Sequence, residues 1–272
     1  TYKVYLDEYK VHIKEPLGRR LLKDVRGEHI QKLFNDMAKR YSHTTVNLVR
    51  VILSGMYTQA VRNGMVLRNP HRNKKKRKKK IRVMTTEEQN LFMRYSKSSQ
   101  FCDLYMVALG TGMRSGELRA LQWSDIDFDN KIIHVNGTLK YIAKAKVKYM
   151  IDEPKSESSK RDIPMLDNLV TVLREHRKRQ LVTRMLLGDK WRPEPGFESL
   201  VFTGGFGRCI SENALYQDMK KIIVQIREDG HVFGAHTPHS LRHTFATRGF
   251  ERGIPPKVMQ EILGHKSITM TL

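Results

Sequence analysis

Two histidines and an arginine lie close together near the end of the 272-residue sequence, in a run that reads TPHSLRH. Thr237 is a good N-cap and Pro238 is tolerated at the first helical position, so a helix is predicted to begin here. On that helix His239, Arg242 and His243 occupy positions i, i+3 and i+4 and share one face. Because a guanidinium is a fork of donors that matches phosphate oxygens, this face favours an anion.

The same two histidines also fit a metal site, since zinc enzymes use histidines four residues apart with a glutamate between them. Here the charged residue between them is Arg242, and a fixed cation at that range opposes a divalent metal. No clustered carboxylates accompany the histidines, which disfavours a metal-dependent nuclease. A plainer alternative is an ordinary helix with a core histidine and a surface arginine. We predict neither a metal nor a cofactor.

Three further features support the anion interpretation. Arg114 lies at a glycine-bracketed helix start, GTGMRSGEL, where backbone N–H groups and the helix dipole favour an anion. Glu117, three residues later, is placed to hold or orient the Arg114 guanidinium. Lys155 stands at the entrance of a serine-rich turn, where a hairpin tip presents its ammonium group to a ligand. His265 follows Gly264, a predicted helix stop.

Residues 1–70 are predicted to form a small all-helical domain. Ser42 and Thr44 offer N-caps, Gly64 offers a C-terminal stop, and Pro70 disfavours helical geometry in the residue before it. Apolar residues recur there at helical spacing, namely Leu33, Phe34, Met37, Val46, Val49, Ile52, Leu53, Met56, Tyr57, Ala60 and Val61.

Residues 71–82 are predicted to be a basic linker, because adjacent like charges repel one another and do not pack. The whole chain has 50 Lys or Arg against 28 Asp or Glu, a formal net charge of +22. This balance disfavours a generic metabolic enzyme and favours nucleic acid, with an anionic lipid surface or a merely solvated run as alternatives. The uninterrupted basic residues of the linker are Lys74, Lys75, Lys76, Arg77, Lys78, Lys79 and Lys80.

Residues 83–272 are predicted to form a second, mixed domain. Residues 85–88 read as a capping box that begins a helix. Apolar residues alternate over residues 126–135 and 147–151, which indicates a small antiparallel sheet. Helical periodicity returns from Leu166 onward. The predicted fold class is therefore mainly α with one small antiparallel β-sheet, an α+β arrangement.

The sequence also indicates the cellular compartment in which we expect the protein. No apolar run approaches the roughly 18 residues that cross a bilayer, so no membrane partner is expected. Cys102 and Cys209 are too few for a disulfide framework, and no charged-then-apolar leader is recognised. We expect a reducing, cytoplasmic location.

In order along the chain, the motifs Thr-Gly-x-Arg114-x-x-Glu-Leu, Lys155, His239-x-x-Arg242-His243 and Leu-Gly-His265 resemble those of the tyrosine recombinases. Among these the sequence is most similar to integrases of phages and integrative conjugative elements. The resemblance spans nearly the whole chain. It implies a helical core-binding domain and a catalytic domain that close around DNA as a C-shaped clamp.

The resemblance also implies roles for individual residues. Arg114 and Arg242 would clamp the two non-bridging oxygens of the scissile phosphate. Lys155 would protonate the departing 5′ oxygen, and His239 would serve as acid or base toward a tyrosine. His265 would donate a hydrogen bond to the phosphate.

The reaction implied by the resemblance is metal-independent DNA strand transfer through a 3′-phosphotyrosyl intermediate, with Glu117 and His243 bracing the active groups. In the family the nucleophilic tyrosine follows the histidine of the Leu-Gly-His motif by about nine residues, and this sequence extends seven residues past His265. We therefore expect residues 1–272 to lack the nucleophile and to form no covalent adduct with DNA.

The partners implied are double-stranded DNA attachment sites, a tetramer assembled on DNA, and DNA-bending accessory proteins, with integration or excision of a mobile element at the bacterial nucleoid as the outcome. Lys74 to Lys80 are predicted to contact DNA along the hinge between the domains, and the lysine-rich insertion over residues 137–148 extends the basic surface. The alternative is a non-catalytic DNA-binding protein of the same fold, although binding alone does not need all five candidate catalytic residues.

Overall fold

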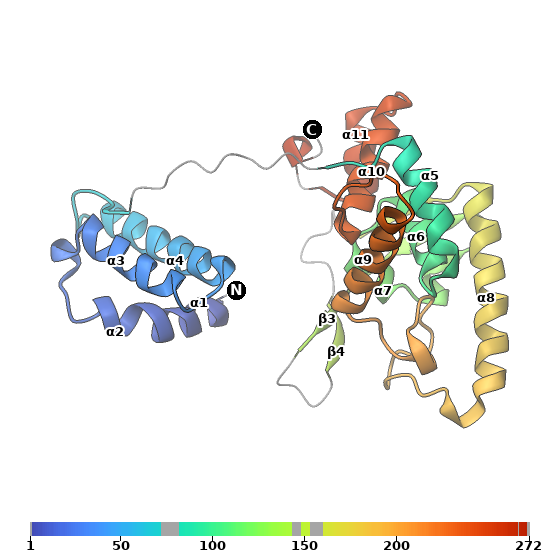
Figure 1. Cartoon of the computed structure of the whole chain (residues 1–272), viewed down its shortest axis with the longest axis horizontal. Coiled ribbons are helices and arrows are strands. Elements are labelled where there is room, and N and C mark those ends of the chain that lie inside the picture. The colour runs from blue at the N-terminus through green and yellow to red at the C-terminus, as the bar shows by residue number, and fades with distance from the viewer. Residues whose placement is uncertain (1, 72–81, 143–147, 153–159, 266, 271–272) are drawn as a thin grey trace. The chain divides into compact units, whose positions relative to one another are not determined.

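A computed structural model describes residues 2–71, 82–142, 148–152, 160–265 and 267–270 (Figure 1). The chain divides into two units, Thr1–Lys79 and Lys80–Leu272. Both are mainly helical, and the second also carries small antiparallel sheets, which agrees with the predicted fold class. Over the described residues no helix combines the length and the apolar character needed to cross a membrane.

Within residues 2–71 the first unit has helices and no strand. Ser42 caps the longest of them, its Oγ accepting a hydrogen bond from the Thr45 N–H at 3.3 Å. Val49, Leu53 and most other predicted apolar positions lie in its core. The helices are α1 (Tyr2–Glu8), a π-helical turn (Tyr9–Ile13), α2 (Lys14–Leu17), α3 (Gly27–Ala38) and α4 (His43–Arg62).

Two positions of the predicted apolar stripe, Met56 and Val61, are exposed instead. The apolar stripe on α4 is broader than the face that joins the core through Val49, Leu53 and Tyr57. Periodicity alone therefore assigned too many of its residues to the interior.

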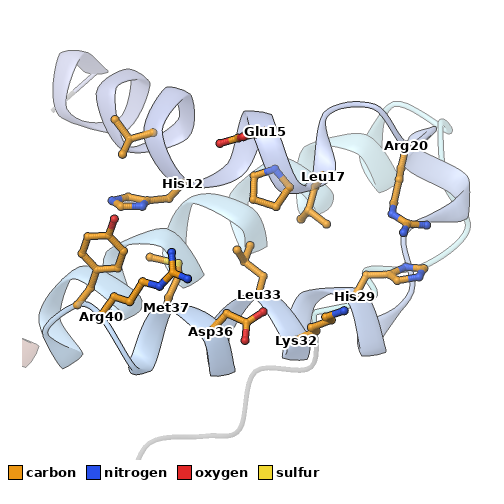
Figure 2. Close-up of a pocket in the computed structure, with 13 residues that line it drawn as sticks. His12, Glu15, Leu17, Arg20, His29, Lys32, Leu33, Asp36, Met37 and Arg40 are labelled. Atoms are coloured by element: carbon orange, nitrogen blue, oxygen red, sulfur yellow. The ribbon is translucent and has the colours of Figure 1, made fainter.

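A groove of about 440 Å³ lies in the first unit (Figure 2). Helix α3 forms one wall of the groove, and the π-helical turn together with α2 forms the other. His12 is buried at one end, with its ring centroid 4.6 Å from that of Tyr41 and its Nε2 3.4 Å from a Glu8 carboxylate oxygen. Because charges of both signs line this groove, it favours no ligand of a single charge. The charged residues are Glu15, Arg20, Lys32, Asp36 and Arg40.

In the second unit, α6 lies among the other helices and contacts α5, α8 and α10. Its apolar residues, such as Leu104 and Val107, belong to the main core. The helices are α5 (Thr86–Tyr95), α6 (Cys102–Thr111), α7 (Ser115–Ala120), α8 (Asp167–Leu187), α9 (Glu212–Glu228), α10 (Pro238–Glu251) and α11 (Pro256–Leu263).

The strands form two sheets rather than the single sheet predicted. One has the order β1-β2-β5, and the other pairs β3 with β4. Strand β3 was not expected, because it contributes a single buried residue, Leu139, to a small satellite cluster. The strands are β1 (Ile126–Asp127), β2 (Ile132–Val135), β3 (Thr138–Tyr141), β4 (Tyr149–Asp152) and β5 (Arg161–Pro164).

The register of β5 sets the direction of one charged side chain. Ile163 pairs with Ile133 and Arg161 pairs with Val135, and Ile133, Val135 and Ile163 are all buried in the core. Side chains two residues apart on a strand share a face. Arg161 is therefore directed to the same side of the sheet as Ile163.

Two local features of the helices were open to sequence analysis or bear on the site. Thr85 and Glu88 form the predicted capping box of α5, with both reciprocal hydrogen bonds at 3.1 Å. Gly112 ends α6 with a φ of +65°, and a Cβ atom there would lie 2.4 Å from the ring of Phe245 on α10. Only glycine fits this backbone and this distance between α6 and α10.

Candidate active site

Three arginine side chains from three elements converge on the carboxyl end of α11. Arg161, Arg242 and Arg114 donate to the carbonyl oxygens of residues 262, 263 and 264, at 2.5, 2.5 and 3.1 Å respectively. The last carbonyls of a helix lack partners within the helix and carry partial negative charge. The arginines satisfy these oxygens and thereby fix the helix end beside His265.

Glu117, on α7, joins two of the three arginines. Both its carboxylate oxygens accept from Arg161, at 2.9 and 3.2 Å, and one accepts from Arg114 Nη1 at 2.7 Å. The other also accepts from the Arg114 backbone N–H at 2.8 Å. Burial alone would raise the pKa of Glu117, but the hydrogen bonds and charges of Arg161 and Arg114 hold it below its usual value.

Arg242 is the most deeply buried of the three arginines, with 3% of its surface exposed. Besides its bond to α11, its Nη1 donates to the Gly112 carbonyl at 2.8 Å. Burial and the neighbouring charge of Arg114 lower its pKa to about 9, so it remains a cation at neutral pH. Arg242 thus adds a third cation beside Arg114 and Arg161, the two arginines that Glu117 contacts, and clustered positive charge favours an anion.

The three candidate histidines lie at the same cluster. The rings of His239 and His243 are in edge contact, with centroids 4.6 Å apart. Burial lowers the pKa of each, and the charge of Arg242 lowers both further. Burial, Arg242 and Arg114 lower the pKa of His265 to about 4. The histidines are therefore mainly neutral at pH 7, a state in which each ring has one donor and one acceptor nitrogen.

Helix α10, which carries Arg242, is anchored by the segment that precedes α5. The Met84 N–H donates to Thr244 Oγ1 at 3.2 Å, and Arg248 Nη2 donates to the Met84 carbonyl at 2.7 Å. The Met84 side chain is fully buried in the core. These contacts fix the rotation of α10 and hence the direction of its charged face.

The Phage integrase family model matches residues 82–272, which is most of the chain. The chain belongs to the phage integrase family of tyrosine recombinases. It is 31% identical, over its whole length, to a XerC-like tyrosine recombinase of Caldanaerobacter subterraneus subsp. tengcongensis, of which it covers 72%. It is 27% identical, over 95% of its length, to the transposase from transposon Tn916 of Enterococcus faecalis, of which it covers 65%.

Solved structures of tyrosine recombinases share the fold. The chain matches the Tn1549 transposon integrase, determined in complex with transposon right end DNA, with a TM-score of 0.81 at 24% identity. This match covers 100% of the chain and 87% of that structure. A λ integrase dimer bound to a core site matches with a TM-score of 0.62 at 22% identity, over 99% of the chain and 86% of that structure.

The site residues predicted from the recombinase motifs fall into two groups. Arg114, His239, Arg242 and His265 come together, with Glu117 and His243 against them, as the contacts above describe. Lys155 and the basic run 74–80 lie outside the described residues. Among the residues that the structure does describe, no group of three or more His, Cys, Asp or Glu is arranged to hold a metal ion.

Arg161 is the member of the recombinase cluster that the sequence analysis missed. The sequence did contain a signal, because Arg161 stands two residues before the apolar Ile163 and so shares its inward face. A charged residue on the core face of a strand needs a buried partner. Glu117 supplies that partner at a separation of 44 residues, which local patterns do not reveal.

Replacing Glu117 by glutamine should destabilise the recombinase strongly. The change removes the charged carboxylate from the buried pair of Glu117 with Arg161, and breaking a buried ion pair typically costs about 3–5 kcal/mol. Urea unfolding of the purified chain measures the loss. The matched change Glu228→Gln, at an exposed position on α9, should alter the unfolding free energy by no more than about 0.5 kcal/mol. Equal effects would show that Glu117 does not hold the cluster.

His265 should titrate well below an ordinary histidine. Its pKa is about 4 in the folded chain against 6.5 for an ordinary histidine. The unfolded state therefore takes up this proton first, so the contribution of His265 to stability falls as the pH drops from about 6.5 to 4. NMR titration of the imidazole measures the midpoint directly, and His265→Gln should flatten the stability profile in that window. A midpoint near 6.5 in the folded chain would contradict the burial and charge described above.

Proposed function

We propose that the chain comprises the core-binding domain (residues 1–70), basic linker (71–82) and catalytic domain (83–272) of a site-specific DNA recombinase. It would cleave and rejoin DNA through a 3′-phosphotyrosyl intermediate during integration or excision of a mobile element. The observation that carries the proposal is that Arg114 and Arg242, 128 residues apart in the sequence, donate to adjacent carbonyls at the end of α11.

In this proposal the two guanidinium groups grip a single phosphodiester. Charge develops on the non-bridging oxygens as the phosphorus becomes pentacoordinate, and fixed cations in a low-dielectric site stabilise that charge without reorganising. Arg114 is partly exposed, whereas Arg242 is buried. We infer that Arg114 meets the incoming phosphate at the surface and that Arg242 binds it from below.

The histidines supply donors and acceptors to the same phosphate. His265, neutral at pH 7 because of its low pKa, donates an N–H to a phosphate oxygen. His239, whose pKa is also lowered by burial and by Arg242, accepts the proton of the attacking tyrosine hydroxyl. His243 orients His239 through the contact between their rings.

Further parts of the proposal rest on the family resemblance. Lys155 protonates the departing 5′ oxygen. The resemblance places the nucleophilic tyrosine about nine residues after His265, and we propose that this tyrosine, rather than one within residues 1–272, forms the covalent link to DNA. The substrate is a double-stranded attachment site, held by a DNA-assembled tetramer with DNA-bending accessory proteins, in the cytoplasm at the bacterial nucleoid.

Cleavage is tested with the chain extended by its natural carboxyl-terminal continuation. The extended chain is incubated with a nicked suicide DNA substrate in the presence of EDTA, which removes divalent metals. We expect a covalent protein–DNA adduct from the extended chain and none from residues 1–272. Arg242→Gln should reduce the rate of adduct formation by about 10²–10³, the usual effect of losing one charge-stabilising donor. Arg94→Gln, at an exposed position on α5, is the matched control.

The other outcomes of this assay separate the alternatives. Cleavage that appears only with magnesium would indicate a metal-dependent nuclease. Specific DNA binding without any adduct from the extended chain would indicate a non-catalytic DNA-binding protein. An adduct formed by residues 1–272 alone would place the nucleophile within this sequence.

The basic run Lys74–Lys80 is proposed to follow DNA phosphates. Each neutralised phosphate contributes about −0.9 to the slope of log affinity against log salt concentration. Replacing the run by serines should therefore flatten this slope by several units and change sequence preference little. Fluorescence anisotropy over a salt series measures both. An unchanged slope would mean that the run is only solvated.

A further inference from the structure

The last turns of α8 carry an apolar face that the described residues leave uncovered. Leu181 and Val182 are 51% and 55% exposed, and Met185 and Leu186 are each 82% exposed. On a helix, positions four apart lie above one another, so these side chains form two adjacent rows on one face. Single exposed apolar residues are ordinary, but contiguous ones mark interaction surfaces. We call these four residues the α8 face.

A groove borders the α8 face. It has a volume of about 620 Å³ and is formed by Leu181 and Met185 with Trp191 and Pro193 from the segment after α8. Within the second unit, α8 lies at the edge, and α5 and α6 stand between it and α10 (Figure 1). The α8 face is therefore separate from the arginine cluster, and a molecule bound there would not occupy the anion site.

The charges around the α8 face limit what can cover it. Residues 177–192 contain six Lys or Arg and one Asp. Lys178 and Arg179 pair with Glu175 and Asp103, which leaves four basic residues against the one Asp. A second copy of the chain would bring the same excess positive charge against this segment and be repelled. DNA phosphates would match the charge but offer no apolar surface for Met185 and Leu186. An occupant must therefore combine acidic residues with apolar ones.

We propose that the α8 face docks an acidic amphipathic helix of another protein. The apolar side of such a helix packs on Met185 and Leu186 and fills the groove beside Trp191, as in other helix-in-groove complexes. Its flanking carboxylates lie against basic residues such as Arg184, which borders the groove. This surface gives the recombinase a means of recruiting a protein partner without contact at the anion site.

The probe is a synthetic helix with leucines along one face and glutamates elsewhere, paired with a second helix in which lysines replace the glutamates. Binding to residues 1–272 is measured by fluorescence anisotropy without DNA. We expect the acidic helix to bind at least about tenfold more tightly than the basic one. Leu186→Gln and Met185→Gln should each weaken it by about tenfold, the effect of losing one apolar anchor. Arg184→Glu should weaken the acidic helix and strengthen the basic one.

Val232→Gln is the matched control, since Val232 is 96% exposed on a segment that does not line this groove. It should leave binding unchanged, and unfolding curves should show that all variants fold alike. Absence of binding, or equal binding of the acidic and basic helices, would overturn the proposal. So would a dimer in sedimentation experiments that Leu186→Gln abolishes, because the α8 face would then bind a second copy.

Discussion

The central constraint on this site is the repulsion among three guanidinium groups that are held close together at the end of α11. Glu117 neutralises one of the three and fixes Arg114 and Arg161. The carbonyls at the end of α11 contribute only partial charges, yet they bind all three arginines. The positive charge gathered in this cluster is what we propose suits the place to a phosphate.

The rest of the second unit is arranged to resist that repulsion. Gly112 lets α10 approach α6 closely enough for Arg242 to reach the Gly112 carbonyl. Met84 anchors α10 from the other side through Thr244, and the pairing of β5 with β2 directs Arg161 toward Glu117. Buried cations are expensive unless they are paired and hydrogen-bonded. Packing of the surrounding core therefore supplies the stability that the charge cluster lacks.

Local sequence patterns, formed by residues a few positions apart, predicted much of this arrangement. The N-cap at Thr237, the helix stop at Gly264 and the shared face of His239, Arg242 and His243 follow from local geometry, and the structure contains each of them. Strand β3 was missed because its single buried residue, Leu139, gives no alternating pattern. The role of Arg161 was missed because its partner Glu117 lies 44 residues away, a contact that helical and strand periodicities do not encode.

Burial lowers the pKa values of the histidines, and the charges of the arginines lower them further, so an anion beside the arginines affects the histidines too. Arg114 and Arg242 both disfavour a proton on His265 and on His239. A phosphate between the guanidinium groups offsets that repulsion and makes protonation of both rings more favourable. In the proposed mechanism, acceptance of a proton at His239 is thereby coupled to occupancy of the anion site. His239 would then become a more effective base where there is a phosphate to act upon.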